Sequence, residues 1–169
     1  MNWLDTLRID LQRYPQHAFF REQSIWAIAL YRLGHAMNTT PNGIARRVGE
    51  PIYWLAFRIV ETLTGCSFSK AVRIGSGLRI HHFGGIFIHD DVQIGRNCTL
   101  RQGVTLGNRH PGGGVPIVGD DVEFGAYAQV LGAVKIGSRA KIGAMAVVVH
   151  DVPEGATVVG MPARVVKRR

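Results

Sequence analysis

Two short segments of this 169-residue chain combine histidine with glycine, and both have the composition of a proton-transfer site. The first is His81-His82-Phe83-Gly84-Gly85, and the second is the segment 107–117, GNRHPGGGVPI, which contains Arg109 and His110. Imidazole titrates near neutral pH, so histidine is well suited to take a proton from a hydroxyl group. Neighbouring glycines allow a ligand to approach the backbone. His82 and His110 are therefore candidate catalytic residues.

Each of these histidines also has an explanation without chemistry. His82 could be a half-buried side chain bonded to a backbone carbonyl, and His110 an ordinary residue of a surface loop. His35, His89 and His150 lie in regular helical or repeat contexts, where we expect surface or core roles. The position of His82 beside a glycine pair favours a functional role.

A six-residue repeat forms the scaffold that must position these segments. In ten hexads the first residue is Ile, Leu, Val or Phe, the second is usually glycine, and the fifth is small or branched. The hexads begin at Ile74, Ile88, Ile94, Leu100, Val118, Phe124, Val130, Ile136, Ile142 and Val148. This period predicts a parallel β-helix of four to five coils, in which each coil buries the apolar face of the next and glycine permits the turn.

The repeat is interrupted at the two histidine segments. Ile88 follows Ile80 by eight positions rather than six, with the excess at residues 81–85. Val118 follows Leu106 by twelve positions, and the intervening residues offer no good core positions, so we expect a loop that folds outward.

Residues 1–65 differ from the repeat, and we divide the chain into a helical region, 1–65, and a β-helix domain, 66–169. Apolar residues at helical spacing, such as Ile25 and Ile28 and then Trp54, Ile59 and Leu63, predict two or three helices. Residues 38–43 predict a turn or loop between them.

Composition limits the function classes. The net charge is +8, and 16 of the 20 basic residues are arginine, which suits either a phosphate-bearing partner or a plain solvated surface. No nucleic-acid motif appears, so we expect no nucleic-acid partner. The 2 cysteines form neither a disulfide framework nor a CxxC metal site. Without an apolar signal core we expect a cytoplasmic protein, with a peripheral membrane contact through its N-terminal part.

The hexads, the segment 79–126 and the terminal GMPARVV (160–166) resemble the serine acetyltransferases and the colanic-acid or exopolysaccharide type acetyltransferases. The resemblance implies a left-handed parallel β-helix, acetyl-CoA as co-substrate, no metal, and a homotrimer with active sites between neighbouring chains. It implies that His82 is the general base, with backbone N–H groups for the oxyanion. It places a second histidine near His110.

The same resemblance suggests the binding residues. Those expected at the acceptor are His81, Gly84, Gly85 and Arg109. Those expected at the coenzyme are Gly107, Gly125, Ala126, Ala128, Gly143, Ala144, Arg164 and Lys167. Arg168 and Arg169 would join the last two at the coenzyme's phosphate end.

Departures from the serine enzymes concern carboxylates. In the serine enzymes the residue before the catalytic histidine is acidic, and here that residue is His81. The position of the aspartate that orients their histidine is occupied here by Ser67. Their helical region supplies a further aspartate to the substrate site, and the matching residues 12–16 contain no acid. Asp90 is our candidate for a replacement acid. Because an ammonium group needs a carboxylate partner away from water, we prefer a sugar hydroxyl of a surface or exopolysaccharide precursor as acceptor, with L-serine as the alternative. We expect no complex with cysteine synthase.

Two other classes remain as alternatives. A γ-type zinc hydrolyase would use His81, His82 and His110 as ligands, but the hexad FGAYAQ lacks a histidine for such a site. A non-catalytic β-helix scaffold would explain why Ser67 replaces the orienting aspartate.

Overall fold

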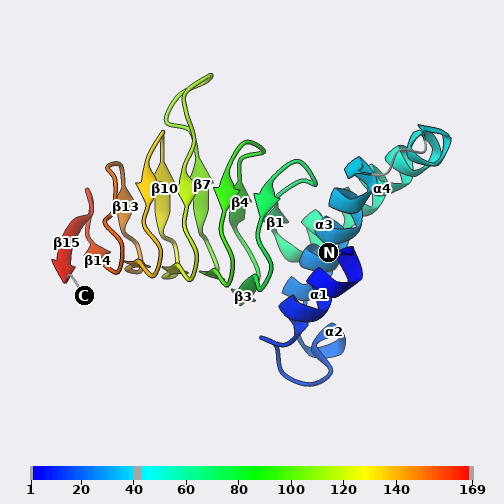
Figure 1. Ribbon diagram of the computed structural model, residues 1–169, viewed down its shortest axis with the longest axis horizontal. Coiled ribbons are helices and arrows are strands. Elements are labelled where there is room, and N and C mark those ends of the chain that lie inside the picture. Colours follow the sequence, from blue (N-terminus) through cyan, green and yellow to red (C-terminus); the bar gives the residue numbers. More distant parts are fainter. Residues whose placement is uncertain (1, 40–42, 168–169) are drawn as a thin grey trace.

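Helices at the N-terminal end of the chain lead into a long stack of short strands (Figure 1). This computed structural model describes residues 2–39 and 43–167. The helices are α1 (Trp3–Leu11), α2 (Ala18–Arg21), α3 (Ser24–Thr39) and α4 (Gly43–Thr64). The sequence predicted two or three helices, and the structure adds the single turn of α2, which is too short to show a period.

The expected loop at 38–43 is only partly described. Asn38 still belongs to α3 and Gly43 already belongs to α4, while residues 40–42 lie outside the described part. None of the described helices combines the length and apolar character needed to cross a membrane.

Three sheets form the walls of a parallel β-solenoid. Sheet A contains β1 (Cys66–Ser67), β4 (Ile86–Ile88), β7 (Thr105–Gly107), β10 (Gln129–Leu131) and β13 (Val147–Val148). Sheet B contains β2 (Arg73–Ile74), β5 (Gln93–Ile94), β8 (Ile117–Val118) and β11 (Lys135–Ile136). Sheet C contains β3 (Arg79–His81), β6 (Thr99–Arg101), β9 (Glu123–Phe124), β12 (Lys141–Ile142), β14 (Thr157–Val159) and β15 (Arg164–Lys167).

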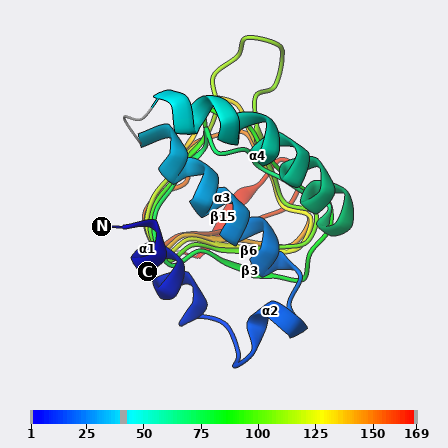
Figure 2. The ribbon, with the colours of Figure 1, turned by 90° about the vertical axis from the view of Figure 1, so that its right-hand side faces the viewer.

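Each coil contributes one strand to each sheet, and the 5 strands of sheet A mark about five coils, which confirms the predicted solenoid. Neighbouring strands pair in parallel, except that β15 turns back antiparallel on β14. Figure 2 looks along the stack and shows the coils superimposed around a common interior.

The interior of the solenoid is built by the repeat. All ten first positions of the hexads are buried, and so are all ten fifth positions. Leu100 and Cys98 are examples, both at 0% exposure. Burial of a large aliphatic side chain contributes roughly 1.5–3 kcal/mol, and stacking repeats this in every coil.

The second-position glycines serve coil stacking rather than the turn. A Cβ atom at Gly119 would lie 2.7 Å from the backbone nitrogen of Ser138 in the next coil. The left-handed turn residues come two positions later and need not be glycine, as Asn97 (φ 57°) and Tyr127 (φ 58°) show. The expectation that this glycine permits the turn was therefore wrong in its reason.

The helices cover the N-terminal end of the stack and bond to its open strand edges. The Tyr31 hydroxyl donates to the Val72 carbonyl (2.9 Å) and accepts the Ile74 N–H (3.1 Å). The Tyr14 hydroxyl accepts the Ile80 N–H at 3.0 Å. Side chains thus replace the missing neighbouring coil, which leaves fewer strand-edge groups unpaired.

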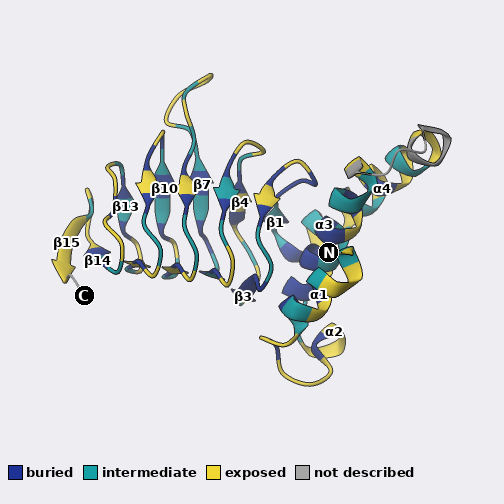
Figure 3. Ribbon diagram, viewed as in Figure 1, coloured by how far each residue is buried: buried dark blue, intermediate teal, exposed yellow. Residues whose placement is uncertain are grey.

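Helix α4 buries one face and exposes an apolar stripe on the other (Figure 3). Tyr53 and Phe57 pack inward. The exposed stripe, called here the α4 stripe, consists of Val48, Ile52, Leu55, Ile59 and Leu63. The residues that predicted this helix, such as Ile59 and Leu63, therefore lie on its outer side rather than in the core.

Candidate active site

The first histidine segment is a two-residue insertion at one edge of the solenoid. The register pairs His81 with Arg101 and Phe87 with Thr105. Five residues therefore lie between the paired positions in the first coil, and three in the second. The extra length falls at 82–85, where the chain passes from sheet C to sheet A.

His82 is exposed at this insertion and has a left-handed backbone (φ 61°). The same conformation occurs at turn residues of other coils, such as Asn97 and Tyr127, so it belongs to the solenoid turn. The Gly84 carbonyl accepts the Gly103 N–H at 2.9 Å, which ties the insertion to the next coil. A Cβ atom at Gly84 would meet no atom within 4 Å, so open space adjoins the imidazole-bearing segment.

The same edge continues along the solenoid, and we call it the histidine edge. It consists of residues 82–85, 102–103, 126–127 and 144–145 of successive coils. Backbone hydrogen bonds join these coils, from Tyr127 N–H to the Gln102 carbonyl and from Met145 N–H to the Ala126 carbonyl, both 2.8 Å. The small side chains of Ala126 and Ala144 leave space above part of this edge, while Tyr127 and Met145 project into solvent.

Positive charge surrounds His81, which precedes His82. Arg79 flanks it on β3, and Arg101 is its register partner on β6. Partial burial lowers the pKa of His81, and the charges of Arg79 and Arg101 lower it further. His81 is therefore biased towards the neutral form. The positive surroundings of His81 are unfavourable for a cationic substrate group, which an acidic site would bind.

The second histidine segment is a loop that leaves the solenoid between β7 and β8, as predicted. Arg109 donates to the carbonyls of Leu131 (3.2 Å) and Val149, so its guanidinium pins the loop to two later coils. His110 is exposed, and its Nδ1 lies 3.4 Å from the Pro111 carbonyl oxygen. A cavity of about 270 Å³ lies under the loop, lined by both residues with Gly113 and Gly114.

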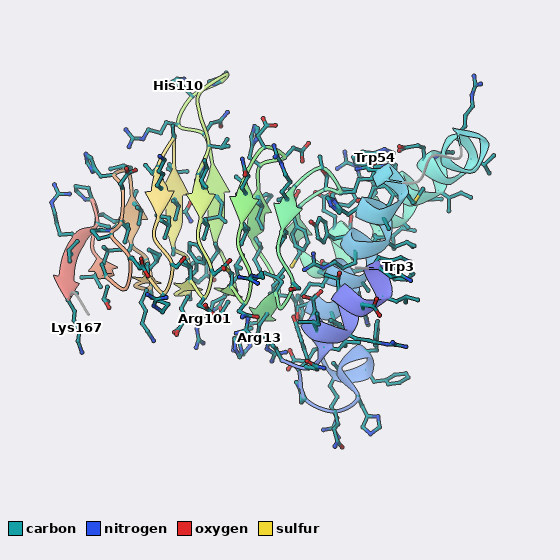
Figure 4. The ribbon with its side chains drawn as sticks, viewed as in Figure 1. Trp3, Arg13, Trp54, Arg101, His110 and Lys167 are labelled. Atoms are coloured by element: carbon teal, nitrogen blue, oxygen red, sulfur yellow. The ribbon has the colours of Figure 1, made fainter. Side chains whose placement is uncertain are left out.

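The structure does not bring the two histidine segments of one chain together. Figure 4 shows His110 on the upper edge and Arg101, the register partner of His81, on the lower edge. Sheet A separates the two edges, and each of its strands runs from one to the other.

Asp90 also lies away from His82 in the same chain. It follows β4 at the far end of that strand and accepts the Ser69 hydroxyl at 2.7 Å. Three strand residues span about 10 Å, so Asp90 lies too far from His82 of its own chain to orient the imidazole. The prediction that it does so is wrong for a single chain. Ser67 lies on β1 with Phe87 as its register partner, and its hydroxyl cannot replace a carboxylate charge.

The glycines and alanines expected at the coenzyme fall into three groups. Gly125, Ala126, Gly143 and Ala144 lie on or beside the histidine edge, whereas Gly107 lies at the opposite edge. Ala128 is fully buried. Its N–H donates to the Gly125 carbonyl within the turn and its carbonyl accepts the Thr105 N–H, so neither group is free to bind a ligand.

The basic coenzyme candidates lie at the far end of the stack. Arg164 and Lys167 belong to β15, where both are exposed. Figure 4 shows Lys167 at the C-terminal end of the lower edge, the edge that also carries Arg101. Arg168 and Arg169 lie outside the described residues.

Several side chains along β3 and β6, the strands next to His82, were not predicted from the sequence. Arg79 and Arg101 flank buried strand residues, but the repeat alone gives no reason to single them out. Arg13 arrives from the segment after α1 and donates to the Thr99 hydroxyl (2.8 Å) on β6. Tyr127 could have been noticed, because it is a large residue at a left-handed turn position.

Among the described residues, no three or more His, Cys, Asp or Glu side chains are arranged to hold a metal ion. Cys66 and Cys98 are both free and buried.

Comparison with known proteins agrees with this architecture. The family described as bacterial transferase hexapeptide (six repeats) matches residues 116–150. Serine acetyltransferase of Helicobacter pylori (strain ATCC 700392 / 26695) is 37% identical over 95 residues, covering 52% of this chain and 51% of that protein. The putative colanic acid biosynthesis acetyltransferase WcaB of Escherichia coli K12 is 34% identical over 84 residues, covering 48% of this chain and 52% of that protein.

Solved structures extend the similarity over nearly the whole chain. Soybean serine acetyltransferase, solved as the apoenzyme, superposes with a TM-score of 0.86 at 30% identity, covering 98% of this chain and 69% of that one. A serine acetyltransferase solved in complex with CoA gives a TM-score of 0.81 at 29% identity, covering 98% and 70%.

A six-residue repeat wound into a parallel β-solenoid defines the hexapeptide transferase class. Within that class, the chain belongs to the acetyltransferase family that includes the serine acetyltransferases. The matched segment spans about half the length of the H. pylori and E. coli relatives.

Proposed function

We propose that this protein is an acetyl-CoA-dependent O-acetyltransferase in which His82 is the general base. The observation that carries the proposal is the placement of His82: exposed, at an insertion, next to open space. Family membership supports the reaction class, and the solved relative bound to CoA supports the donor.

In the proposed reaction, acetyl-CoA supplies the acetyl group as an activated thioester. His82 takes the proton of the acceptor hydroxyl as its oxygen attacks the thioester carbonyl. The Gly84 N–H group is directed at the buried Cys66 thiol, whereas the Gly85 N–H group bonds to no backbone carbonyl within the described chain and can donate to the oxyanion. The alanines of the histidine edge leave room for the pantetheine arm.

Our preferred acceptor is a sugar hydroxyl of a surface or exopolysaccharide precursor. His81 stands where the serine enzymes have an acid, and Ser67 replaces their orienting aspartate. An ammonium group would meet Arg79 and Arg101 rather than a free carboxylate. L-serine remains the alternative acceptor, because several relatives carry the name serine acetyltransferase.

Thiol release from acetyl-CoA, measured with serine and then with nucleotide sugars, distinguishes the two acceptors. Saturable turnover with serine alone would exclude the sugar preference. Turnover with neither acceptor, together with no CoA binding in calorimetry, would favour a non-catalytic scaffold.

The role of His82 has a matched control. His82 and His17 are both exposed and both left-handed, with φ of 61° and 62°. Asparagine tolerates this conformation, so His82→Asn and His17→Asn remove an imidazole at equal backbone strain. We expect His82→Asn to lower turnover by on the order of 10²–10⁴-fold and His17→Asn to leave it unchanged. Equal turnover in both variants would remove His82 from the mechanism.

The proposed assembly is a homotrimer with sites between chains. The location of His82 and His110 on opposite edges supports it, because a neighbouring chain could bring its loop to the histidine edge. Light scattering measures the stoichiometry, and a monomer that is fully active would contradict the shared site.

Location is a separate expectation. The α4 stripe, flanked by the exposed residues Arg47 and Arg58, has the character of a surface for the peripheral membrane contact. Flotation with anionic vesicles, comparing the protein with Leu55→Ser, tests that contact. A cytoplasmic location rests on the sequence alone.

A further inference from the structure

Three arginines lie along the outer face of β3 and β6: Arg13 at the start of these strands, where it also bonds the Gly77 and Cys98 carbonyls, and Arg101 at the end nearest His82. Arg79 lies on β3, Arg101 on β6, and Arg13 reaches Thr99 of β6 from the helical region. Figure 4 shows Arg13 and Arg101 near each other along the lower edge of the solenoid. His81 lies within the same group, as the register partner of Arg101.

Arg79 is a buried cation with incomplete partners. Its side chain is 8% exposed, and among the described residues its one carboxylate partner is Glu22, with Nη2 3.3 Å from Glu22 Oε1. The guanidinium stacks on Tyr14, 3.7 Å from the ring centroid, while Nε and Nη1 have no hydrogen-bond acceptor. Burial of a charge so weakly paired is unfavourable. A further negative group nearby would offset it.

Arg101 is the accessible member of the group. It is exposed and has no ion-pair partner among the residues that the structure describes. The neighbouring carboxylates are already engaged, since Glu22 bonds to Arg79 and Glu123 bonds to Lys141 at 2.8 Å. A guanidinium in this state can accept a planar oxyanion through two parallel N–H bonds.

The position of Arg101 connects this charge to the chemistry. Its strand neighbour across the ladder is His81, about 4.8 Å away in a β-sheet, and His82 follows directly. An oxyanion on Arg101 would therefore lie at the same end of sheet C as the proposed base.

We propose that Arg101 and His81, supported by the charges of Arg79 and Arg13, form a subsite for an oxyanion group of the acceptor. This inference rests on the proposed acetyltransferase function and deepens it: the acceptor is an anionic hydroxyl compound, carrying a carboxylate or a phosphate. The carboxylate would come from a uronic acid, and the phosphate from a sugar phosphate or nucleotide sugar. Serine suits the subsite less, because its ammonium group would enter a cationic environment.

Paired acceptors that differ by one charge test the subsite. Acetyl transfer is measured with glucuronic acid against glucose, and with glucose 1-phosphate against methyl glucoside. We expect the anionic member of at least one pair to have the higher kcat/KM. The pair that responds identifies the source of the oxyanion.

Variants assign that preference to Arg101. We expect Arg101→Gln to lower kcat/KM for the anionic acceptor on the order of 10–100-fold, mainly through KM, and to leave the neutral acceptor and the KM for acetyl-CoA unchanged. Arg101→Lys should retain part of the effect. The control, Arg139→Gln, removes a guanidinium paired with Glu154 at a different edge and should change neither acceptor.

Two outcomes of these kinetic measurements would overturn the subsite. One is equal use of anionic and neutral acceptors, which leaves the acetyltransferase function intact. Another is a raised KM for acetyl-CoA in Arg101→Gln with unchanged acceptor kinetics, which would assign Arg101 to the coenzyme.

If no acceptor is acetylated, the proposed function fails instead, and calorimetry still tests the subsite. Glucuronate and glucose 1-phosphate are then titrated into the wild-type protein and into Arg101→Gln. Binding to the wild type that weakens in the variant supports the subsite, and equal or absent binding overturns it.

Discussion

The carboxylate of Asp10 and the guanidinium of Arg32 form a buried ion pair through two bonds, of 2.8 and 3.1 Å. Asp10 also accepts the N–H groups of Gly77 (2.7 Å) and Leu78 (2.9 Å), while Arg32 donates to the Ile74 carbonyl (2.7 Å). The pair therefore connects α1, α3 and the first coil in one hydrogen-bonded network. An acid in α1 thus has a structural partner and does not take part in the candidate active site.

Replacing Asp10 should detach the helical region from the solenoid. Asp10→Ala leaves Arg32 buried without its carboxylate, and we expect it to lower the free energy of unfolding by about 3–5 kcal/mol. Urea unfolding followed by circular dichroism measures this. Arg8→Ala, which removes an exposed charged side chain from the same helix, is the control and should change stability by at most about 0.5 kcal/mol. Equal effects of the two variants would contradict the network.

Coil stacking predicts which glycines tolerate a methyl group. In Gly119→Ala the new Cβ atom would lie 2.6 Å from Ser138 Oγ and 2.7 Å from its backbone nitrogen, so we expect a loss of about 1–3 kcal/mol. Gly107→Ala is the control, because its nearest contact would be 4.0 Å, at His89 Cβ. Thermal unfolding separates them, and a loss in both variants would show that glycine is needed for another reason.

The cysteines should be unreactive in the folded protein. Burial raises the pKa of the Cys98 thiol to about 11 and also raises that of Cys66. Few thiolates form at neutral pH, and reagents cannot reach them. A chromogenic disulfide reagent should therefore titrate no protein thiol before denaturation and 2 after it. Rapid modification of the native protein would indicate that the solenoid opens.

His81→Asp tests why the site disfavours an ammonium group. The new carboxylate would lie beside Arg101 and the acceptor, and would provide the counter-charge that serine requires. We expect kcat/KM for serine to rise on the order of tenfold relative to the anionic sugar. His89→Asp, in which the acid lies at the other edge, is the control. An unchanged ratio in His81→Asp would show that acceptor choice is made elsewhere.

Shared sites predict complementation between inactive chains. If each site takes His82 from one chain and His110 from its neighbour, an equal mixture of His82→Asn and His110→Ala chains restores about a quarter of the wild-type sites. Co-refolding followed by the thiol-release assay measures the recovery. Each variant refolded alone is the control, and activity no higher than in these controls would exclude a site shared in this way.

The repeat made most of the solenoid predictable, because each hexad position has a local environment that recurs. Val130 and Ala146 could be placed in the interior from spacing alone. The outward loop was predictable for the same reason, since residues 108–116 offer no aliphatic side chain at the required position.

The surroundings of His82 were less predictable because they depend on pairs distant in sequence. Arg13 and Thr99 are 86 residues apart, and the periodicity of neither segment implies their contact. Asp90 is close to His82 in sequence but is separated from it by β4. For α4, the 3.6-residue period identified a helix, but the burial of Tyr53 rather than Ile59 depends on where α3 lies.

The two ends of the strand stack are closed by different elements. At the N-terminal end, hydroxyl and charged side chains of the helices occupy the hydrogen-bonding positions of a preceding coil. At the other end, β15 reverses direction, so the parallel ladder cannot simply continue from it. A second molecule therefore finds no matching template at either end, which protects this repetitive structure against end-to-end polymerisation into filaments. The homotrimer proposed above would use the side walls instead, where the candidate active site lies.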